Sequence, residues 1–379
     1  MQMVSSRARA GIAKLGRACL GASLPLTLAG PAVATAQLPR GVVADGTAAE
    51  PSAAAQTAAP PTADQVRDQY EDGRPIAGVE VHVRVWHSDA KAARDAVARA
   101  LREVERITAK LAPDGPASEI ASINKTADHD EVILSTETFG LLNQALEVCR
   151  ESKGAFDPTV GAYDYLWNFR HRPAVRPLEL ELQARKGMIG CEYVSLKPGR
   201  IVRLMRRGAR LRMSDMAHGA AMQAAAAALR DAGIHNFRLR VGADVYVAGR
   251  TGTRHWYVAV QHPDDPKRDL VQLYLTSHAA ATRHWAEHSF VKDGQRYHDV
   301  IDPRSGKPAS GVAMATVIGN DPVVADALSA AVFVLGPREG IRLIERTERV
   351  EGFVIDDKGK VWGSSGMSDY ARLPETVDL

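Results

Sequence analysis

Residues 323–336, VVADALSAAVFVLG, constrain the fold more than any other segment of the chain. Their apolar run predicts a buried helix that Asp321 caps, that begins at Pro322 and that ends at Gly336. Asp326 carries the only charge within the segment. An ionised carboxylate in a buried helix is costly unless a positive group or a metal ion accompanies it. The fold must therefore bring a partner to Asp326.

The remaining patterns predict an α+β fold. Residues 78–86 alternate apolar and polar side chains, as a half-buried strand does, and residues 88–111 have the spacing of an amphipathic helix that Ser88 caps. Because helices and strand pairs occur in blocks, we expect mixed, mostly antiparallel sheets flanked by helices rather than a doubly wound sheet. Further helices are expected at 135–152, 215–234 and 340–348, and further strands at 193–214 (three short strands), 237–249, 255–263, 270–278 and 351–362. The strands at 255–263 and 270–278 are expected to continue the sheet that contains 237–249.

The first 36 residues have the layout of a secretory signal peptide. A basic leader precedes an apolar stretch that is too short to span a bilayer, and AVATA offers a cleavage site that ends at Ala36. Residues 37–70 are rich in Ala, Pro and Thr and predict a flexible linker, which leaves residues 71–379 as the folded domain. We therefore expect a soluble protein that is periplasmic or otherwise exported and has no membrane span.

Cleavage after residue 36 changes the formal net charge from +3 to −1, because the leader holds four positive charges and no negative ones. The basic character belongs to the leader, so no nucleic-acid-binding surface is expected. Two cysteines, Cys149 and Cys191, remain in the mature chain. They form either one disulfide or two buried free thiols, since the sequence does not show how close they lie.

One short motif fits a zinc peptidase. His284, Glu287 and His288 match the inverted zinc-protease pattern H-x-x-E-H, which on a helix places two histidine ligands and a base on one face. The match rests on three residues, no third ligand is evident downstream, and the flanking residues have strand and loop patterns. Chance is the better explanation of this motif.

A second constellation is spread over half the chain, and its most specific pieces are FDPTVG, IDPRSGKP and ADALS. Together with its neighbours it resembles the FAD:protein FMN transferase family, the ApbE-type proteins, over roughly residues 75–365. The resemblance implies a two-lobed α+β fold and export to the periplasm. The segments that carry it, in order, are residues 118–124, 154–169, 217–244, 293–308 and 325–336.

The resemblance also implies an activity. Members of the family bind FAD with a divalent metal, usually Mg²⁺, transfer the FMN moiety to a Thr or Ser hydroxyl of a partner flavoprotein, and release AMP. A hard cation suits this reaction, because it prefers oxygen ligands and neutralises charge on the pyrophosphate.

Site residues follow from the resemblance by position. Asp326 stands where the family has its metal-binding carboxylate, and Asp215 stands where a backbone carbonyl binds the metal. His298, next to the family's I-D-P motif, is assigned a proton-handling role. His298 and Asp326 are therefore the two expected catalytic residues. The residues assigned to the cofactor are Ala155, Phe156, Asp157, Arg212, His218 and Asp244.

Several family positions carry other residue types here. Ala330 replaces the Thr that supplies a second metal ligand, and we expect Ser329 or water to substitute. Arg212 replaces an Asp, and we expect its guanidinium to bind phosphate in place of metal charge. The other substitutions are His218 for Lys, Arg283 within the A-T-S-G turn, and Asp299 for His.

Ordinary structural roles remain open for the same residues. In this alternative interpretation, Asp326 caps a turn or pairs with Arg212 in a core. His218 then lies on the surface of an Ala-rich helix, and Asp244 belongs to a turn or bulge. The sequence thus leads to an FMN transferase, with a catalytically impaired flavin- or protein-binding relative as the alternative.

Overall fold

The computed structural model describes residues 69–167, 169, 175–251 and 255–379. All of these residues belong to one compact unit. The expected signal peptide and nearly all of the expected linker lie outside the described residues. The first strand begins at Gln69, two residues before the expected start of the domain.

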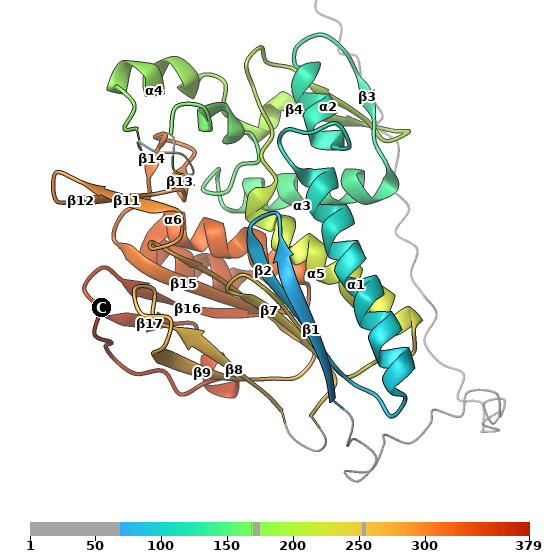
Figure 1. Ribbon diagram of the computed structural model, residues 1–379. Helices are drawn as coiled ribbons and strands as arrows, with labels where there is room; N and C mark the ends of the chain where they lie inside the picture. Colours follow the sequence, from blue (N-terminus) through green and yellow to red (C-terminus); the bar gives the residue numbers. More distant parts are fainter. Residues whose placement is uncertain (1–68, 168, 170–174, 252–254) are drawn as a thin grey trace, which may run out of the picture. The chain divides into compact units, whose positions relative to one another are not determined.

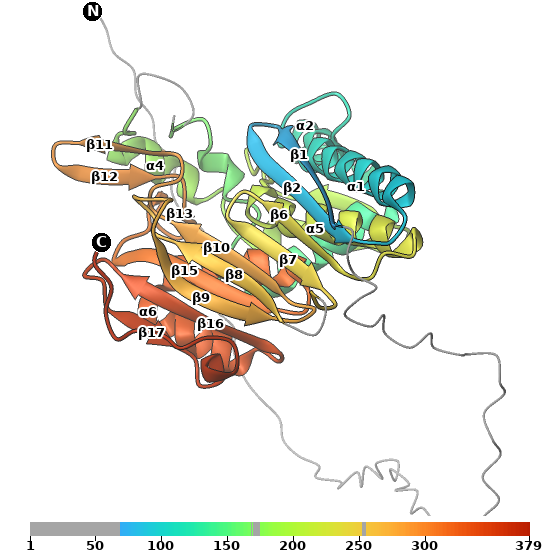
Figure 2. The ribbon, with the colours of Figure 1, turned by 60° about the horizontal axis from the view of Figure 1, so that its bottom comes forward.

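An eight-stranded sheet is the centre of the fold (Figures 1 and 2). Every strand pairing in it is antiparallel, which confirms the α+β prediction. In sheet order the strands are β1 (Gln69–Ile76), β2 (Val79–Trp86), β6 (Phe237–Val241), β7 (Asp244–Ala248), β10 (Ala279–His284), β15 (Val312–Gly319), β16 (Val350–Asp356) and β17 (Val361–Gly363).

Helices cover one face of this sheet and share one continuous apolar core with it. Asp89, rather than the expected Ser88, caps the first helix, because its carboxylate accepts the N–H groups of Lys91 and Ala92. Two short helices were not predicted, since seven or eight residues show too little periodicity. The six α-helices of the described residues are α1 (Ala90–Leu111), α2 (Glu119–Lys125), α3 (Thr136–Glu151), α4 (Glu179–Lys186), α5 (Ser214–Asp231) and α6 (Pro322–Arg346).

Helix α6 contains the segment that constrained the prediction. Asp321 caps it and Pro322 is its first residue, as expected. Gly336, with φ 81° and ψ 178°, interrupts the helix, and a second helical segment continues from Pro337. Within the described part of the chain, no helix combines the length and apolarity that a membrane crossing requires.

The opposite face of the sheet is covered by a hairpin of β8 (Trp256–Gln261) and β9 (Asp269–Leu275), as Figure 2 shows. The sequence predicted that these strands continue the main sheet, and this was wrong. They pair only with each other. The strands beneath them, β7 and β10, are already bonded on both sides, so the hairpin packs through its side chains instead.

Smaller sheets complete the fold. Only two of the three strands expected at 193–214 form, because residues after the turn at Gly208 make a single bridge, Val160 to Arg210. Helix α4, the β11–β12 hairpin and the β13–β14 pair gather at one end of the main sheet (Figure 1). The strands of the smaller sheets are β3 (Val132–Ile133), β4 (Val194–Lys197), β5 (Ile201–Leu204), β11 (Ser289–Lys292), β12 (Gln295–His298), β13 (Ile301–Asp302) and β14 (Lys307–Pro308).

Candidate functional site

Asp326 is fully buried on α6, and its partner is Arg283. The Arg283 Nη2 atom lies 2.5 Å from Asp326 Oδ1. The second carboxylate oxygen, Oδ2, accepts the backbone N–H of Gly219 at 2.9 Å. Both oxygens therefore have a donor, and the positive partner is a guanidinium. The expected alternative pairing with Arg212 was wrong.

Local structure explains why these groups meet. Side chains alternate along β10, and Ala279 and Ala281 face the helices, so Arg283 faces the helices too. Gly219 on α5 permits the close approach of α5 to α6, since a Cβ there would lie 2.1 Å from the Pro322 carbonyl oxygen. This approach brings the Gly219 N–H to Asp326.

A second buried carboxylate, Asp244, lies beside the first. Its Oδ2 is 2.9 Å from His218 Nδ1, and its Oδ1 accepts the Thr282 N–H at 2.7 Å. His218 is therefore not a surface residue. Asp244 is the first residue of β7, directly after the tight turn at Gly242, whose φ is 60°. Burial opposes the charged imidazole, but the Asp244 carboxylate raises the pKa of His218.

Arg212 is also nearly buried and lies between two carboxylates. It donates to Asp164 at 3.0 Å and to Asp215 at 2.9 Å. Asp215 is in the first turn of α5. Burial works against the ionised form of Asp215, yet the neighbouring Arg212 and Arg283 lower its pKa. The ion pairs thus form one ionic cluster, whose members are Asp164, Arg212, Asp215, His218, Asp244, Arg283 and Asp326.

Burial dominates the titration of Asp326. It raises the pKa of this carboxyl to about 7, and the positive charge of Arg283 opposes that rise. Arg283 itself stays charged, because Asp326 and Asp244 raise its pKa despite burial. The cluster therefore balances its own charge to a large extent with side chains of the protein.

The residues at this position do not fit a divalent cation. Mg²⁺ requires several oxygen ligands at about 2.0–2.1 Å in octahedral geometry. Both Asp326 oxygens are engaged, Ala330 carries no oxygen, and the Ser329 hydroxyl donates to the Asp326 carbonyl at 2.7 Å within the helix. At residue 215, where the resemblance assigned the backbone carbonyl to the metal, the side-chain carboxylate is bound to Arg212. We therefore derive no step through a metal ion.

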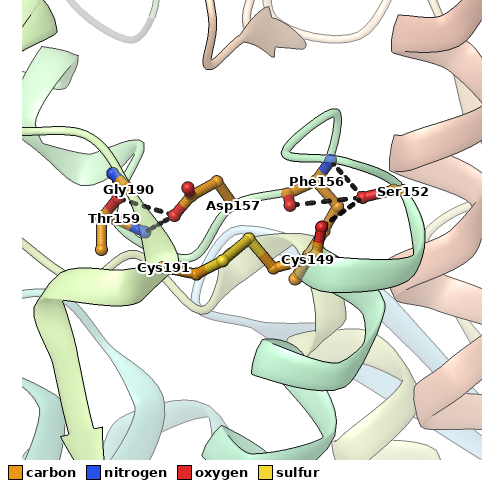
Figure 3. The surroundings of a disulfide bond; sticks show 7 residues. All are labelled: Cys149, Ser152, Phe156, Asp157, Thr159, Gly190 and Cys191. Carbon is orange, nitrogen blue, oxygen red and sulfur yellow. Dashed lines mark hydrogen bonds between the residues drawn. A yellow bond between two sulfur atoms is a disulfide. The ribbon is translucent and has the colours of Figure 1, made fainter. Parts of the chain in front are cut away.

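The expected flavin-contacting residues border the cluster, since the Arg212 backbone N–H donates to the Pro158 carbonyl at 2.7 Å, but their side chains have other partners (Figure 3). Ala155, Phe156 and Asp157 are buried. Asp157 accepts the N–H and the O–H of Thr159 at 2.8 and 2.6 Å, and the Thr159 oxygen accepts the N–H of Gly190 at 2.8 Å. Burial raises the pKa of Asp157 in spite of these donors.

A disulfide between Cys149 and Cys191 lies beside Asp157 (Figure 3). Of the two alternatives that the sequence left open, the disulfide is therefore the one that forms, with the Cα atoms 6.5 Å apart. The two sulfur atoms and the Asp157 carboxylate are the only set of three potential metal ligands grouped together in the described residues. Because the sulfurs are bonded to each other, this set is not a thiolate metal site.

His298 lies at the end of β12, against a cavity of about 510 Å³. Its Nε2 lies 3.1 Å from the Ala309 carbonyl oxygen, to which it donates, while its buried Nδ1 has no hydrogen-bond partner in the described structure. Burial lowers the pKa of His298 to about 4, so the ring is neutral at pH 7. Other side chains lining the cavity are Trp167, Arg176, Trp285, Arg296, Tyr297 and Lys307.

The zinc-peptidase pattern is not assembled. His284 is the last residue of β10, and Glu287 and His288 lie in the turn that follows, so the two histidines do not share a helix face. His288 Nδ1 is 3.0 Å from the carboxylate of Asp299. The motif matches in sequence, but its residues do not have the helical geometry of a zinc-peptidase site.

The sequence prediction missed the role of Arg283. It noted this residue as a substitution but did not connect it with Asp326. A usable signal was present, because the small residues Ala279 and Ala281 precede Arg283 with period two and mark the face that a helix covers. Asp164, the second partner of Arg212, had no signal in the sequence.

Comparison with known proteins identifies relatives over most of the chain. A family model described as the ApbE family matches residues 77–354. The FAD:protein FMN transferase of Vibrio cholerae is 26% identical over 291 residues, which cover 75% of this chain and 86% of the relative. The FAD:protein FMN transferase of Treponema pallidum is 25% identical over 328 residues, which cover 80% and 89%.

Solved structures agree with this match. The crystal structure of the ApbE protein from Thermotoga maritima superposes with a TM-score of 0.74 at 27% identity, covering 80% of this chain and all of that one. The flavin transferase ApbE from Vibrio cholerae gives a TM-score of 0.69 at 26% identity, covering 80% and 99%. Since the family match spans well over half of the sequence, this chain belongs to the ApbE family.

Proposed function

We propose that this protein is an FAD:protein FMN transferase, which moves the FMN moiety of FAD to a Thr or Ser hydroxyl of a partner flavoprotein and releases AMP. The observation that carries the proposal is the family match over residues 77–354, which includes both Asp157 and Asp326. The likeness in fold to the flavin transferase of Vibrio cholerae supports it.

The proposed reaction replaces a phosphoanhydride bond of FAD by a phosphate ester bond to the acceptor. The acceptor hydroxyl oxygen attacks the phosphorus on the FMN side of the pyrophosphate, the bond to the AMP phosphate breaks, and the hydroxyl loses its proton. We assign His298 to this proton, because its Nδ1 is neutral, buried and without a partner in the described structure. The aromatic side chains lining the adjacent cavity suit a planar ring.

The pyrophosphate is negatively charged, and this chain offers guanidinium groups where the sequence resemblance predicted a metal. Arg212 and Arg283 both belong to the ionic cluster, and the Nε of each is buried without a hydrogen-bond partner in the described residues. Guanidinium groups stabilise transferring phosphoryl groups in other enzymes. We assign these two residues to the phosphates of FAD.

We also propose that the protein works outside the cytoplasm. The first 36 residues have a signal-peptide layout. The Cys149–Cys191 disulfide supports this, because disulfides persist in oxidising compartments such as the periplasm. The acceptor would then be a periplasmic flavoprotein that presents a Thr or Ser.

The test is an incubation of the purified mature protein with FAD and a candidate flavoprotein. The proposal predicts a fluorescent flavin band on the acceptor in a denaturing gel and one AMP per flavin attached. Replacement of the acceptor Thr or Ser by Ala should abolish both signals. His298→Ala should slow transfer by roughly a hundredfold or more. A band that persists on the Ala acceptor would contradict the proposed chemistry.

A second candidate function is favoured by one observation. The Arg283–Asp326 ion pair, together with Ala330, occupies the place that the resemblance assigned to a catalytic metal. A relative that binds flavin without transferring it would share this feature. Retained FAD binding with no band and no AMP, for every acceptor tried, would favour this function.

A further inference from the structure

We propose that the guanidinium of Arg283 replaces the divalent cation at Asp326, so that this site excludes metal ions and FAD binds without one. The inference concerns the same site as the proposed function and rests on its FAD-binding half. It does not depend on whether the FMN moiety is then transferred.

The contacts at Asp326 place a donor on each carboxylate oxygen, and one of these donors is a positive charge. The Arg283 Nη2 atom is 2.5 Å from Oδ1, and the Gly219 N–H holds Oδ2. Asp326 is fully buried, and the side chain of Arg283 is 10% exposed. A divalent ion in contact with the same oxygen would lie against a fixed positive charge in a region shielded from water, where like charges repel strongly.

Both oxygens of the second carboxylate in the cluster, Asp244, are engaged as well. Asp244 accepts the Thr282 N–H on one oxygen and faces His218 with the other. The His218 ring and the Arg283 guanidinium therefore occupy the sides from which an incoming metal would approach the two carboxylates.

Substitutions at distant points of the sequence act in the same direction. Ala330 removes a hydroxyl from the helix turn after Asp326, and Ser329 directs its own hydroxyl to a helix carbonyl. Arg212 places a second guanidinium near the first turn of α5, paired with Asp215. Judged by the sequence resemblance, Ala330 lacks an oxygen ligand and Arg212 adds positive charge, so both substitutions act against a cation.

The guanidinium groups keep donors for a ligand. The Nε atoms of Arg212 and Arg283 are buried and have no acceptor among the described residues. An unpartnered buried donor is costly, so a native site normally supplies it with a partner. Phosphate oxygens are good acceptors for guanidinium donors, which fits a bound pyrophosphate. These donors suit a phosphate-bearing ligand, which fits the pyrophosphate of FAD in the proposed function.

The first experiment measures cation binding directly. Mn²⁺ is added to the apo protein, and the electron paramagnetic resonance signal of free aqueous Mn²⁺ is followed. We expect wild type to leave the signal unchanged, and the double variant Arg283→Ser/Ala330→Thr to reduce it with one ion per chain. Stoichiometric loss of the signal with wild type would overturn the inference, whatever the variant does.

The second experiment measures FAD binding by calorimetric titration in excess EDTA and in excess Mg²⁺. We expect wild-type affinities that agree within about twofold, and at least a tenfold gain with Mg²⁺ in the double variant. An affinity for wild type that falls tenfold in EDTA would contradict the inference. Arg342→Ser, which removes an exposed arginine paired with Glu339, is the matched control and should behave as wild type.

The two experiments separate this inference from the proposed function. Wild type that binds FAD equally in both buffers but forms no flavinylated acceptor supports the inference and contradicts the transferase proposal. Wild type that fails to bind FAD in either buffer contradicts both the proposed function and the metal-free binding. In each of these cases, an unchanged Mn²⁺ signal with wild type supports the exclusion of cations, and stoichiometric loss of the signal contradicts it.

Discussion

Asp326 and Asp157 are both buried carboxylates, but their surroundings differ in charge. Asp326 lies against a guanidinium and one backbone N–H. Asp157 is held by the hydroxyl and the N–H of Thr159, both neutral donors. Burial raises the pKa of both carboxyls. A fixed positive charge therefore lies against Asp326, and the side-chain partner of Asp157 is neutral.

This difference coincides with the substitutions that the sequence resemblance implies. The segment FDPTVG around Asp157 keeps the residue types on which the family resemblance rests, and neutral hydrogen bonds hold it. The surroundings of Asp326 carry substitutions, and ion pairs hold them. We infer that the flavin-contacting region is retained, while the cation-binding region has been rebuilt around arginine.

The largest expected effect comes from removing the positive charge at Asp326. Arg283→Met leaves a buried carboxylate without its partner, and the free energy of unfolding should fall by about 3–5 kcal/mol. Urea unfolding measures the change. The double variant Arg283→Met/Asp326→Asn should recover much of the loss, and the exposed control Arg342→Met should lose less than about 1 kcal/mol. Equal losses for the single and double variants would show that Arg283 acts through packing alone.

The disulfide gives the next largest effect, on the Asp157 side of the comparison. It closes a loop with a sequence separation of 42 residues, so Cys149→Ser/Cys191→Ser should lower the free energy of unfolding by about 2–4 kcal/mol. Urea unfolding of the variant and of the reduced wild type should agree. If neither differs from the oxidised wild type, the cross-link does not constrain this loop.

His298 is a third buried ionisable group. It belongs neither to the ion pairs around Asp326 nor to the hydrogen bonds around Asp157. Its pKa is lowered from 6.5 to about 4, so the neutral ring favours the folded state. The resulting stability is complete above pH 6.5 and is lost as the pH falls toward 4, by up to about 3 kcal/mol. His298→Gln keeps a donor to Ala309 and does not titrate. Its free energy of unfolding should therefore decline less than that of wild type between pH 6.5 and 4, and parallel declines would refute the assignment.

The smallest effect concerns the neutral donor of Asp157. Thr159→Val removes the hydroxyl that donates to Asp157 and accepts from Gly190, and it should cost about 1–2 kcal/mol in the free energy of unfolding. Thr136→Val, at an exposed hydroxyl that accepts from Arg200, is the matched control with a smaller loss. A loss as large as that of Arg283→Met would mean that the two carboxylates depend equally on their partners.

The sequence was a good guide to local structure. The cap at Asp321, the burial of α6 and the antiparallel α+β fold all follow from patterns of capping and periodicity. The β8–β9 hairpin was misplaced, because a strand pattern does not show whether a strand joins an edge or packs on a face. Short-range rules carry no information on that choice.

The sequence named candidate site residues but not their partners. Asp326, Asp244, His218, Arg212 and Asp215 meet in one ionic cluster, and their roles toward FAD stay predictions. The cation expected at Asp326 depended on the residue opposite it in space, and Arg283 is 43 positions away in the sequence. Only the packing of α6 on β10 shows that a guanidinium reaches the carboxylate.

The most direct test is a search for Mn²⁺ beside Asp326 in crystals grown with FAD and excess Mn²⁺. Anomalous diffraction locates Mn²⁺ without ambiguity from other atoms. We predict no anomalous peak within bonding distance of Asp326, with Arg283 still in contact with its carboxylate. A peak there, with Arg283 displaced, would contradict the claim that arginine has replaced the metal ion.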